Sequence, residues 1–430
     1  MAENHGLQLT DRESNHQIIK ALSSNALGAF SYGIFQYGIS FMLLHATKSP
    51  LSFGMGLTIA PLVSLLTFIP IGNFVDTHDH KRIIFWGYLL RIIGFVLLGV
   101  ALPFFSGTGL LIPVALFIVL DSFLVNFRNT AYSASIRQFV NESQIPKLSS
   151  LTTACASASR VLAPVFGVLL YSLISVNGLI ALEIVATIIA MIIMMHLHFH
   201  NVDGHQTPRK KVSQTQQFHE TLRYMKKRPF IRDTIIAEIV VNFFYTAVVT
   251  GAPFIIVNEL NLGNDVVATI ETGYAIGYLL GSLITNWFKN QRHFAKRVLV
   301  SLGLVGVALT GLGALFAVAP NKLMIGIMGL LLALLLDLAF AIFDLAVEIR
   351  LQSTVPTRIL GRVSSTLYTA SFAIMPVGTI IYTGLFDFFE HGSYILVLSG
   401  LVLIAYAFFS IDVFSRDIKK DDRFIQRHSD

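Results

Sequence analysis

The sequence predicts an all-α membrane protein with twelve transmembrane helices in two pseudo-symmetric six-helix bundles. Three observations lead to this prediction: the composition, the length of the apolar runs and the distribution of basic residues. Of the 430 residues, 54% are hydrophobic and only 13% are charged, about half the charged share of a soluble domain. The mean hydropathy is +0.68. A soluble protein with buried helices would have shorter apolar runs, of about 10–14 residues.

Twelve apolar runs are long enough to cross the hydrocarbon core of a bilayer, which is about 30 Å thick. The runs do not alternate polar and apolar side chains, so the strands of a membrane barrel are excluded for most of this length. We expect spans at Ala21–Leu44, Leu51–Gly72, Ile83–Phe104, Leu110–Ala134, Leu148–Tyr171, Gly178–Leu197, Thr234–Val257, Val266–Phe288, Val298–Ala317, Leu323–Val347, Val363–Leu385 and Ser393–Phe414.

Basic residues set the expected orientation of these spans. With the N-terminus inside the cell, 26 of the 31 lysines and arginines fall in cytoplasmic segments, and only Lys48 and Lys322 fall in outside loops. Cytoplasmic loops of membrane proteins carry such an excess of basic residues. Both termini are therefore expected in the cytoplasm.

The longest cytoplasmic loop divides the spans six and six. A weak internal repeat supports two similar halves, because Ile136-Arg137 and Ile349-Arg350 stand at equivalent helix exits. We expect a cytoplasmic N-terminal segment (1–20), an N-terminal bundle (21–197), a central loop with an interfacial helix (198–233), a C-terminal bundle (234–414) and a cytoplasmic tail (415–430).

A short charged stretch, Gly72–Arg82, separates the second and third runs. Gly72 lacks a Cβ atom, so the chain can turn or a neighbour can approach there. Asp76 can cap the next helix or accept from its backbone N–H groups. Lys81 and Arg82 can hold the loop at the inner membrane surface and pair with carboxylates.

This stretch resembles the signature of the loop between helices 2 and 3 in the major facilitator superfamily of secondary transporters. It departs from that signature at Thr77, where a basic residue is usual, and at Asp79, where glycine is usual. The resemblance implies that Gly72, Asp76, Lys81 and Arg82 form a conformational switch, with Asp76 latching the two halves in the outward-facing state. The alternative is a plain topology anchor.

A second stretch, Ala163–Gly167, resembles the core of the exporter motif of this superfamily. Small residues at Ser159, Ala163 and Gly167, spaced by four, let a partner helix approach closely. Pro164 removes a backbone hydrogen bond and can kink the helix. Together with His78–Arg82, this stretch resembles the macrolide-efflux and enterobactin-exporter branch of the superfamily. This resemblance implies export. Ordinary helix packing is the alternative.

Charged residues inside the spans are the candidates for ion coupling, because each is costly in hydrocarbon. The proton-coupling candidates are Asp121, Asp337 and Asp344, and Arg128 and Arg160 are possible charge partners of Asp121. The superfamily usually has an arginine near position 121. A structural ion pair that only holds helices together is the competing interpretation. For Arg91, Glu183, Glu238 and Glu271 we expect a position at the membrane interface or a local pairing.

A substrate cavity is expected near the midplane between the two halves, where the resemblance implies that helices 1, 4, 7 and 10 line it. The candidate lining residues are Tyr32, Gln36, Asn126, Asn242 and Tyr245, with Tyr368 from helix 11. Each of them can equally serve helix packing.

The sequence thus predicts a secondary active transporter of the bacterial plasma membrane that works by alternating access. We expect proton-coupled export of amphipathic or hydrophobic organic compounds, drug-like, macrolide-like or siderophore-like. No enzymatic constellation, metal site or phosphate loop is found, so no cofactor is expected beyond the proton gradient. The expected partners are a small-molecule substrate and the lipid bilayer, without nucleic acid, for a monomer. Uptake of a nutrient or lipid-like solute, or a transporter-like sensor without flux, are the alternatives.

Overall fold

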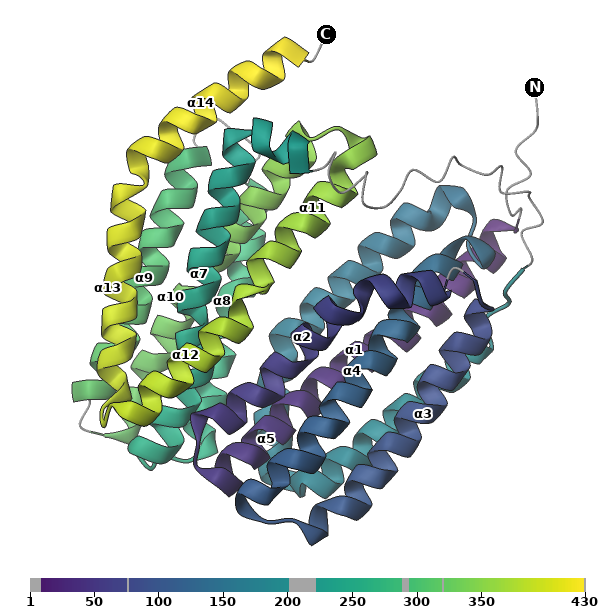
Figure 1. Ribbon diagram of the computed structural model, residues 1–430, viewed down its shortest axis with the longest axis horizontal. Helices are drawn as coiled ribbons and strands as arrows, with labels where there is room; N and C mark the ends of the chain where they lie inside the picture. The colour runs from purple at the N-terminus through teal and green to yellow at the C-terminus, as the bar shows by residue number, and fades with distance from the viewer. Residues whose placement is uncertain (1–8, 76, 201–221, 288–293, 319–320, 429–430) are drawn as a thin grey trace. The chain divides into compact units, whose positions relative to one another are not determined.

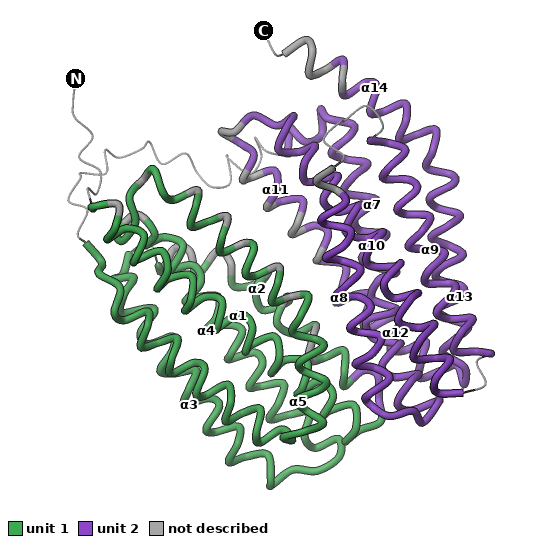
Figure 2. Tube along the Cα trace, turned by 180° about the vertical axis from the view of Figure 1, so that it is seen from behind, with its two compact units in different colours: residues 1–48, 52–207 green, residues 49–51, 208–430 purple. Residues whose placement is uncertain are grey.

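The computed structural model describes residues 9–75, 77–200, 222–287, 294–318 and 321–428 (Figure 1). The chain forms two compact units, which we call the N-terminal unit (residues 1–48 and 52–207) and the C-terminal unit (residues 49–51 and 208–430) (Figure 2). The chain passes from one unit to the other within the expected central loop, 198–233. Residues 201–221 of that loop lie outside the described residues, and residues 222–227 are helical.

The first half of the chain forms long α-helices joined by short 3₁₀ turns. Helix α5 breaks at Ser175, whose φ of 58° and ψ of 177° are not helical, so its two segments correspond to the fifth and sixth expected spans. The helices are α1 (Asp11–Thr47), α2 (Pro50–Val75), α3 (His80–Ala101), α4 (Leu111–Ser135) and α5 (Ile145–Met195), and the 3₁₀ turns are η1 (Leu102–Phe104), η2 (Gly107–Leu110), η3 (Ile136–Gln138) and η4 (Glu142–Gln144).

The second half of the chain is also built from helices. A π-helical turn, η5 (Ile255–Glu259), continues the seventh helix, and the expected eleventh span consists of two helices that meet at Ala373. The helices are α7 (Pro229–Phe254), α8 (Asn264–Trp287), α9 (Phe294–Val318), α10 (Lys322–Thr354), α11 (Thr357–Phe372), α12 (Ile374–Phe388), α13 (Gly392–Phe409) and α14 (Ile411–His428) (Figure 1).

The all-α prediction is confirmed, since the described ranges contain helices and no strand. Nine helices within those ranges are long and apolar enough to cross a membrane. One of the nine, Val161–Met195, contains the break at Ser175. Each expected span overlaps a helix, while the count of twelve crossings stays a prediction.

Large apolar side chains on the outside of the helices are exposed, as expected for a protein that lies in lipid rather than in water. They occur on helices of both units, and examples are Leu97, Leu116, Leu173, Leu283, Leu331 and Leu398.

Both ends of the chain are more helical than the sequence analysis expected. Helix α1 begins at Asp11, inside the segment 1–20, because Thr10 caps it. The Thr10 Oγ1 atom accepts from the Glu13 backbone N–H at 3.3 Å, and Glu13 Oε2 accepts from the Thr10 N–H at 3.2 Å, which is a capping box. At the other end, the expected tail is the amphipathic helix α14.

Close helix packing in each unit depends on small residues. In the N-terminal unit, a Cβ atom added at Gly33 of α1 would lie 2.5 Å from the Ala163 Cβ of α5. In the C-terminal unit, Gly273, Gly277 and Gly281 follow one another at intervals of four on the face of α8 that packs on α10. A Cβ atom at Gly277 would overlap the Leu334 carbonyl group of α10. Small residues at this spacing let two membrane helices touch backbone to backbone.

Gly277→Ala is expected to lower the free energy of unfolding of the C-terminal unit by about 1–3 kcal/mol, since overpacking forces the backbones apart. Thermal unfolding of the purified protein in detergent measures the change. Gly303→Ala in α9 is the matched control, because a Cβ atom there meets nothing within 4 Å. Equal stability of both variants would contradict the close α8–α10 contact.

Candidate functional site

Helices α3, α4 and α5 bring three charged residues together inside the N-terminal unit. Arg91 Nε donates to Asp121 Oδ1 at 2.6 Å, and Arg91 Nη2 lies 2.8 Å from Glu183 Oε1. The three side chains are 1%, 4% and 0% exposed. We call these residues the Arg91 cluster. A planar guanidinium suits this arrangement because it presents several donors to carboxylates in fixed directions.

The Arg91 cluster gives Asp121 a charge partner that the sequence analysis did not name. Arg128 forms no ion pair with a described residue; it lies over the ring of Tyr88 at 4.8 Å, and its Nη1 atom is buried without a hydrogen-bond partner in the described part of the chain. The side chain of Arg160 lies outside the described residues. Arg91 and Glu183 show the local pairing that was expected as one of two possibilities, and both are buried.

Two cavity candidates of the N-terminal unit, Tyr32 and Asn126, have partners within that unit. The Arg91 guanidinium lies 5.4 Å from the centre of the Tyr32 ring. Asn126 Nδ2 donates to Ser64 Oγ at 3.0 Å and so joins α4 to α2. Gln36 is half-buried on α1. Substrate contact by these residues stays a prediction.

The two aspartates predicted on α10 each accept a hydrogen bond from a tyrosine of another helix. Tyr245 Oη of α7 donates to Asp337 Oδ1 at 3.0 Å, and Tyr278 Oη of α8 donates to Asp344 Oδ2 at 3.3 Å. The Tyr245 ring also stacks on Phe340, with centroids 5.0 Å apart. Tyr278 is a partner that the sequence analysis missed.

A third carboxylate of the C-terminal unit, Glu238 on α7, is 4% exposed. Its Oε2 atom accepts from Asn242 Nδ2 at 3.3 Å. The local pairing expected as one of two possibilities for Glu238 is therefore present. The side chain of Tyr368, the last cavity candidate, lies outside the described residues.

Basic residues are absent from the sequence around these carboxylates. Residues 234–288 and 323–349 contain no lysine, arginine or histidine. Asp337 is nevertheless only 7% exposed. Whereas Asp121 has a guanidinium beside it, Asp337 has a neutral phenol, so its negative charge is not balanced by a side-chain cation from these segments.

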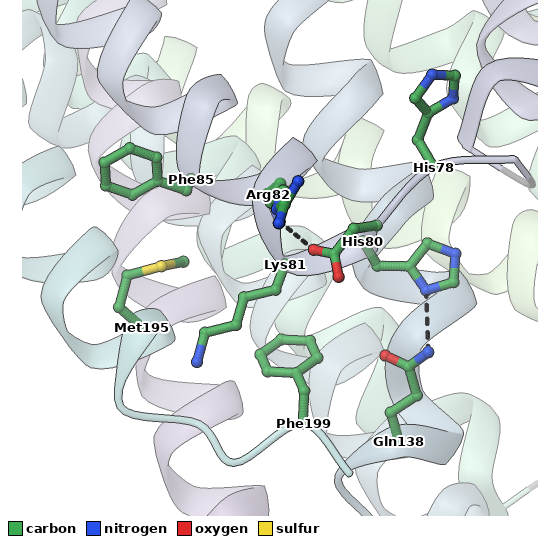
Figure 3. Close-up of a pocket in the computed structure, with 9 residues that line it drawn as sticks. His78, His80, Lys81, Arg82, Phe85, Gln138, Met195 and Phe199 are labelled. Carbon is green, nitrogen blue, oxygen red and sulfur yellow. Dashed lines mark hydrogen bonds between the residues drawn. The ribbon is translucent and has the colours of Figure 1, made fainter. Parts of the chain in front are cut away.

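The loop Gly72–Arg82 borders a cavity of about 480 Å³ in the N-terminal unit (Figure 3). Asp76 lies outside the described residues, and Gly72 is described only as part of α2. The N-cap of α3 is Asp79, whose Oδ1 accepts from the Arg82 backbone N–H at 2.7 Å. The helix cap considered for Asp76 is thus supplied by the residue that departs from the superfamily signature.

The basic residues of this loop point to different partners. The Lys81 ammonium lies 5.4 Å from the centre of the Phe199 ring, and its Nζ is 3.5 Å from the Leu197 carbonyl oxygen. His80 Nδ1 and Gln138 Nε2 are 3.3 Å apart (Figure 3). The loop is therefore tied to the segment that follows α5 and to η3.

The exporter-like motif lies on the face of α5 that packs against α1. Ser159, Ala163, Pro164 and Gly167 are all buried. A Cβ atom at Gly167 would lie 3.0 Å from the Ile34 carbonyl oxygen of α1. The expected close approach of a partner helix is thus present, and α1 is that partner.

A buried ion-pair network, which we call the α14 clamp, joins α14 to the ends of α7 and α10. Arg228 Nη2 donates to Asp421 Oδ2 at 2.8 Å, and Arg350 Nη2 lies 3.5 Å from the same oxygen. Arg228 and Asp421 are 1% and 0% exposed. The sequence analysis placed these residues in loops and missed the network.

A second aspartate of α14 extends the clamp toward the surface. Asp417 Oδ2 accepts from Arg232 Nη2 at 2.7 Å, and its Oδ1 accepts from Lys420 Nζ at 3.0 Å. Burial raises the pKa of Asp417, but Lys420, Arg416 and Arg232 outweigh this effect, and its pKa lies below the ordinary value. Asp417 is therefore ionised at neutral pH.

Asp421→Asn is expected to lower the free energy of unfolding by about 1.5–3 kcal/mol, because buried hydrogen bonds to charged groups are lost or weakened. Arg228 and Arg350 then lose their contact with the Asp421 carboxylate. Thermal unfolding in detergent measures the loss. Asp412→Asn, in the exposed first turn of α14, should change stability little, and an equal effect of both variants would contradict the clamp.

Metal ligands do not gather in the described part of the chain: no group of three or more His, Cys, Asp or Glu side chains there could hold a metal ion.

The chain matches one protein family and is similar to two efflux proteins. The sequence profile of the Major Facilitator Superfamily matches residues 21–379. Macrolide efflux protein A of Streptococcus pyogenes is 24% identical over 398 residues, which covers 90% of this chain and 93% of that protein. Macrolide efflux protein A of Enterococcus faecalis is 23% identical over 338 residues, covering 75% and 100%.

Solved structures share the fold at low sequence identity. A bacterial homologue of the iron transporter ferroportin has a TM-score of 0.67 and 15% identity, covering 94% of this chain and 99% of its own. The D-xylose–proton symporter has a TM-score of 0.68 and 14% identity, covering 92% and 97%. At this identity the likeness concerns the fold alone.

Proposed function

The chain belongs to the Major Facilitator Superfamily, and we propose that it exports amphipathic or hydrophobic organic molecules across the bacterial plasma membrane in exchange for protons. The family makes it a multi-pass membrane transporter rather than an enzyme. Export of macrolide-like compounds is supported by the two relatives named as macrolide efflux proteins. The cytoplasmic location of both termini is part of the proposal and rests on the basic residues.

The observation that carries the proton coupling is Asp337. Its side chain is buried in the C-terminal unit, it accepts from Tyr245 at 3.0 Å, and the surrounding sequence offers no basic residue. An ionised carboxylate at such a place in a membrane costs about 2.5 kcal/mol or more. Binding of a proton removes this cost, so the charge of Asp337 can change with the state of the transporter.

Asp121 has a different role in this proposal. Arg91, which is shared with Glu183, holds Asp121 at 2.6 Å, so Asp121 has a cation beside it and, unlike Asp337, can remain buried without a proton. We therefore assign coupling to Asp337 and Asp344, and we assign Asp121 to holding α3, α4 and α5 together.

The conformational switch is proposed to lie in Gly72, Asp76, Lys81 and Arg82, as the superfamily signature implies. Asp76→Asn is expected to shift the balance between inward-facing and outward-facing states, because the latch loses its charge. Spin-label distances between the two halves measure that balance. If both this balance and the transport rate are unchanged, the stretch Gly72–Arg82 serves only as a topology anchor.

Inside-out membrane vesicles test the proposed function. Vesicles that contain the protein and have an acidic interior should accumulate a radiolabelled macrolide, and a proton uncoupler should abolish the accumulation. Vesicles without the protein are the control. Accumulation that persists with the uncoupler would contradict proton coupling, and accumulation only in right-side-out vesicles would show uptake instead of export.

A further inference from the structure

Three helices of the C-terminal unit each contribute two polar residues seven positions apart. The pairs are Glu238 and Tyr245 on α7, Glu271 and Tyr278 on α8, and Asp337 and Asp344 on α10. Seven residues are two turns of helix, so the members of a pair lie on one face, about 10 Å apart along the axis. The pairs therefore form two layers at different depths of the unit.

The first layer contains Tyr245, Glu271, Tyr274 and Asp337. Tyr245 donates to Asp337 at 3.0 Å. Glu271 lies close enough to interact electrostatically with Asp337 and with Tyr274. Tyr274 is 8% exposed, and its Oη has no hydrogen-bond partner among the described residues. A buried hydroxyl without a partner beside two carboxylates is a place for a proton donor or acceptor.

The second layer repeats this arrangement with Glu238, Asn242, Tyr278 and Asp344. Tyr278 donates to Asp344 at 3.3 Å, and Asn242 donates to Glu238 Oε2 at 3.3 Å. Glu238 and Asp344 interact electrostatically. The other oxygen of Glu238, Oε1, is buried without a hydrogen-bond partner in the described structure.

Both layers result from the way α8 packs on α10. The interval from Glu271 to Asp337 equals that from Tyr278 to Asp344, since both helices keep one register. The backbones of α8 and α10 touch along this contact because of Gly273, Gly277 and Gly281. The side chains on the adjacent face of α8 are therefore close to α10.

Positive charge does not reach these layers from the neighbouring helices that the structure describes. Arg297 and Arg350 lie at the ends of α9 and α10, and Arg350 is engaged by Asp421 and by the rings of Phe230 and Phe294. On α12, Tyr382 is hydrogen-bonded to Ser399 at 3.0 Å. Glu238 and Asp337 are buried and Glu271 and Asp344 are half-buried, and the described side chains around them supply no cation.

We propose that the two layers are two stations of a proton relay, in which Glu271 and Asp337, near Tyr274, share one proton and Glu238 and Asp344 share another. Two carboxylates that interact in a poorly solvated site disfavour the ionisation of both, so each pair should retain a proton that can move. In each step a proton leaves one carboxyl oxygen and binds to the next, and no other bond changes. The proposal rests on the proposed proton-driven export and adds Glu271, Tyr274 and Glu238 to it.

Infrared titration of the purified protein tests the sharing of protons without any transport. Glu271→Gln should remove a protonated-carboxyl band and also shift the pH at which the remaining Asp337 band disappears. Tyr274→Phe should shift that pH without removing a band. Asp265→Asn, at the exposed start of α8 and paired with Lys322, is the matched control and should leave the Asp337 band unchanged. An Asp337 band that titrates identically in Glu271→Gln would overturn the shared station.

Flux measurements in proteoliposomes separate the relay from simple packing. Glu271→Gln should lower proton-driven export about 100-fold, the lower range of effects for a positioned proton-transfer group, while substrate counterflow without net proton movement stays intact. Equal loss of both activities would assign Glu271 to structure and overturn the relay. If wild-type export does not depend on the proton gradient, the proposed function is wrong. The infrared titration still shows whether Glu271 and Asp337 share a proton. If the carboxyl bands shift when an organic amine is added but do not change with pH, the layers are a substrate site instead of a proton relay.

Discussion

Asp337→Asn is expected to reduce proton-driven export about 100-fold, because a positioned proton carrier contributes at least that factor. Asparagine keeps the size of the side chain and can still hydrogen-bond to Tyr245, but it cannot take up or release a proton. Counterflow of a labelled substrate between two equal pools should therefore continue. Transport rates in proteoliposomes, with and without a pH gradient, measure both activities.

Glu348→Gln is the matched control for this variant. Glu348 lies on the same helix, α10, but near its end, where Glu348 Oε1 accepts from Gln352 at 3.1 Å. It should export at the wild-type rate. Full proton-driven export by Asp337→Asn would show that the proton is carried elsewhere, and loss of counterflow in that variant would show that Asp337 holds the helices instead.

Arg91→Leu is expected to lower the free energy of unfolding by about 3–5 kcal/mol, since removal of one partner leaves uncompensated buried charges. Two carboxylates, Asp121 and Glu183, lose their shared cation, and both are at most 4% exposed. Thermal unfolding of the purified protein and the yield of folded protein measure the loss.

The triple variant Arg91→Leu, Asp121→Asn, Glu183→Gln should regain most of this stability, because it carries no buried charge at the cluster. Arg223→Leu, in the helical residues 222–227 with an exposed side chain, is the control and should unfold like the wild type. If the triple variant is no more stable than Arg91→Leu, charge imbalance does not explain the loss.

Much of the fold was predictable because long apolar runs have only one way to satisfy their backbone in lipid. The helix ends were less predictable, although some signals were present. Thr10 and Glu13 have the spacing of a capping box, yet the segment before Ala21 was expected only as a polar stretch. The helix of the tail, α14, has an apolar run that is too short to be identified as a membrane span.

The candidate site was predictable as a set of buried charges but not as pairs. Asp337 and Asp344 stand out because an acid inside an apolar run is costly. Their partners Tyr245 and Tyr278 come from other helices, and the rotation of one helix against another is set by packing that a sequence does not display. For the same reason Arg91, rather than Arg128, is the partner of Asp121. The useful signal was that Arg91 and Glu183 also lie inside spans and must find partners.

The direction of proton movement in proteoliposomes tests proton-coupled export most directly. Vesicles with wild-type protein are loaded with a macrolide and a trapped pH dye, with no pH gradient and no membrane potential at the start. Substrate leaving the lumen should drive protons in, so the lumen should become acidic, and Asp337→Asn should abolish the change. A lumen that becomes alkaline would show symport, and substrate exit without any pH change would contradict proton coupling altogether.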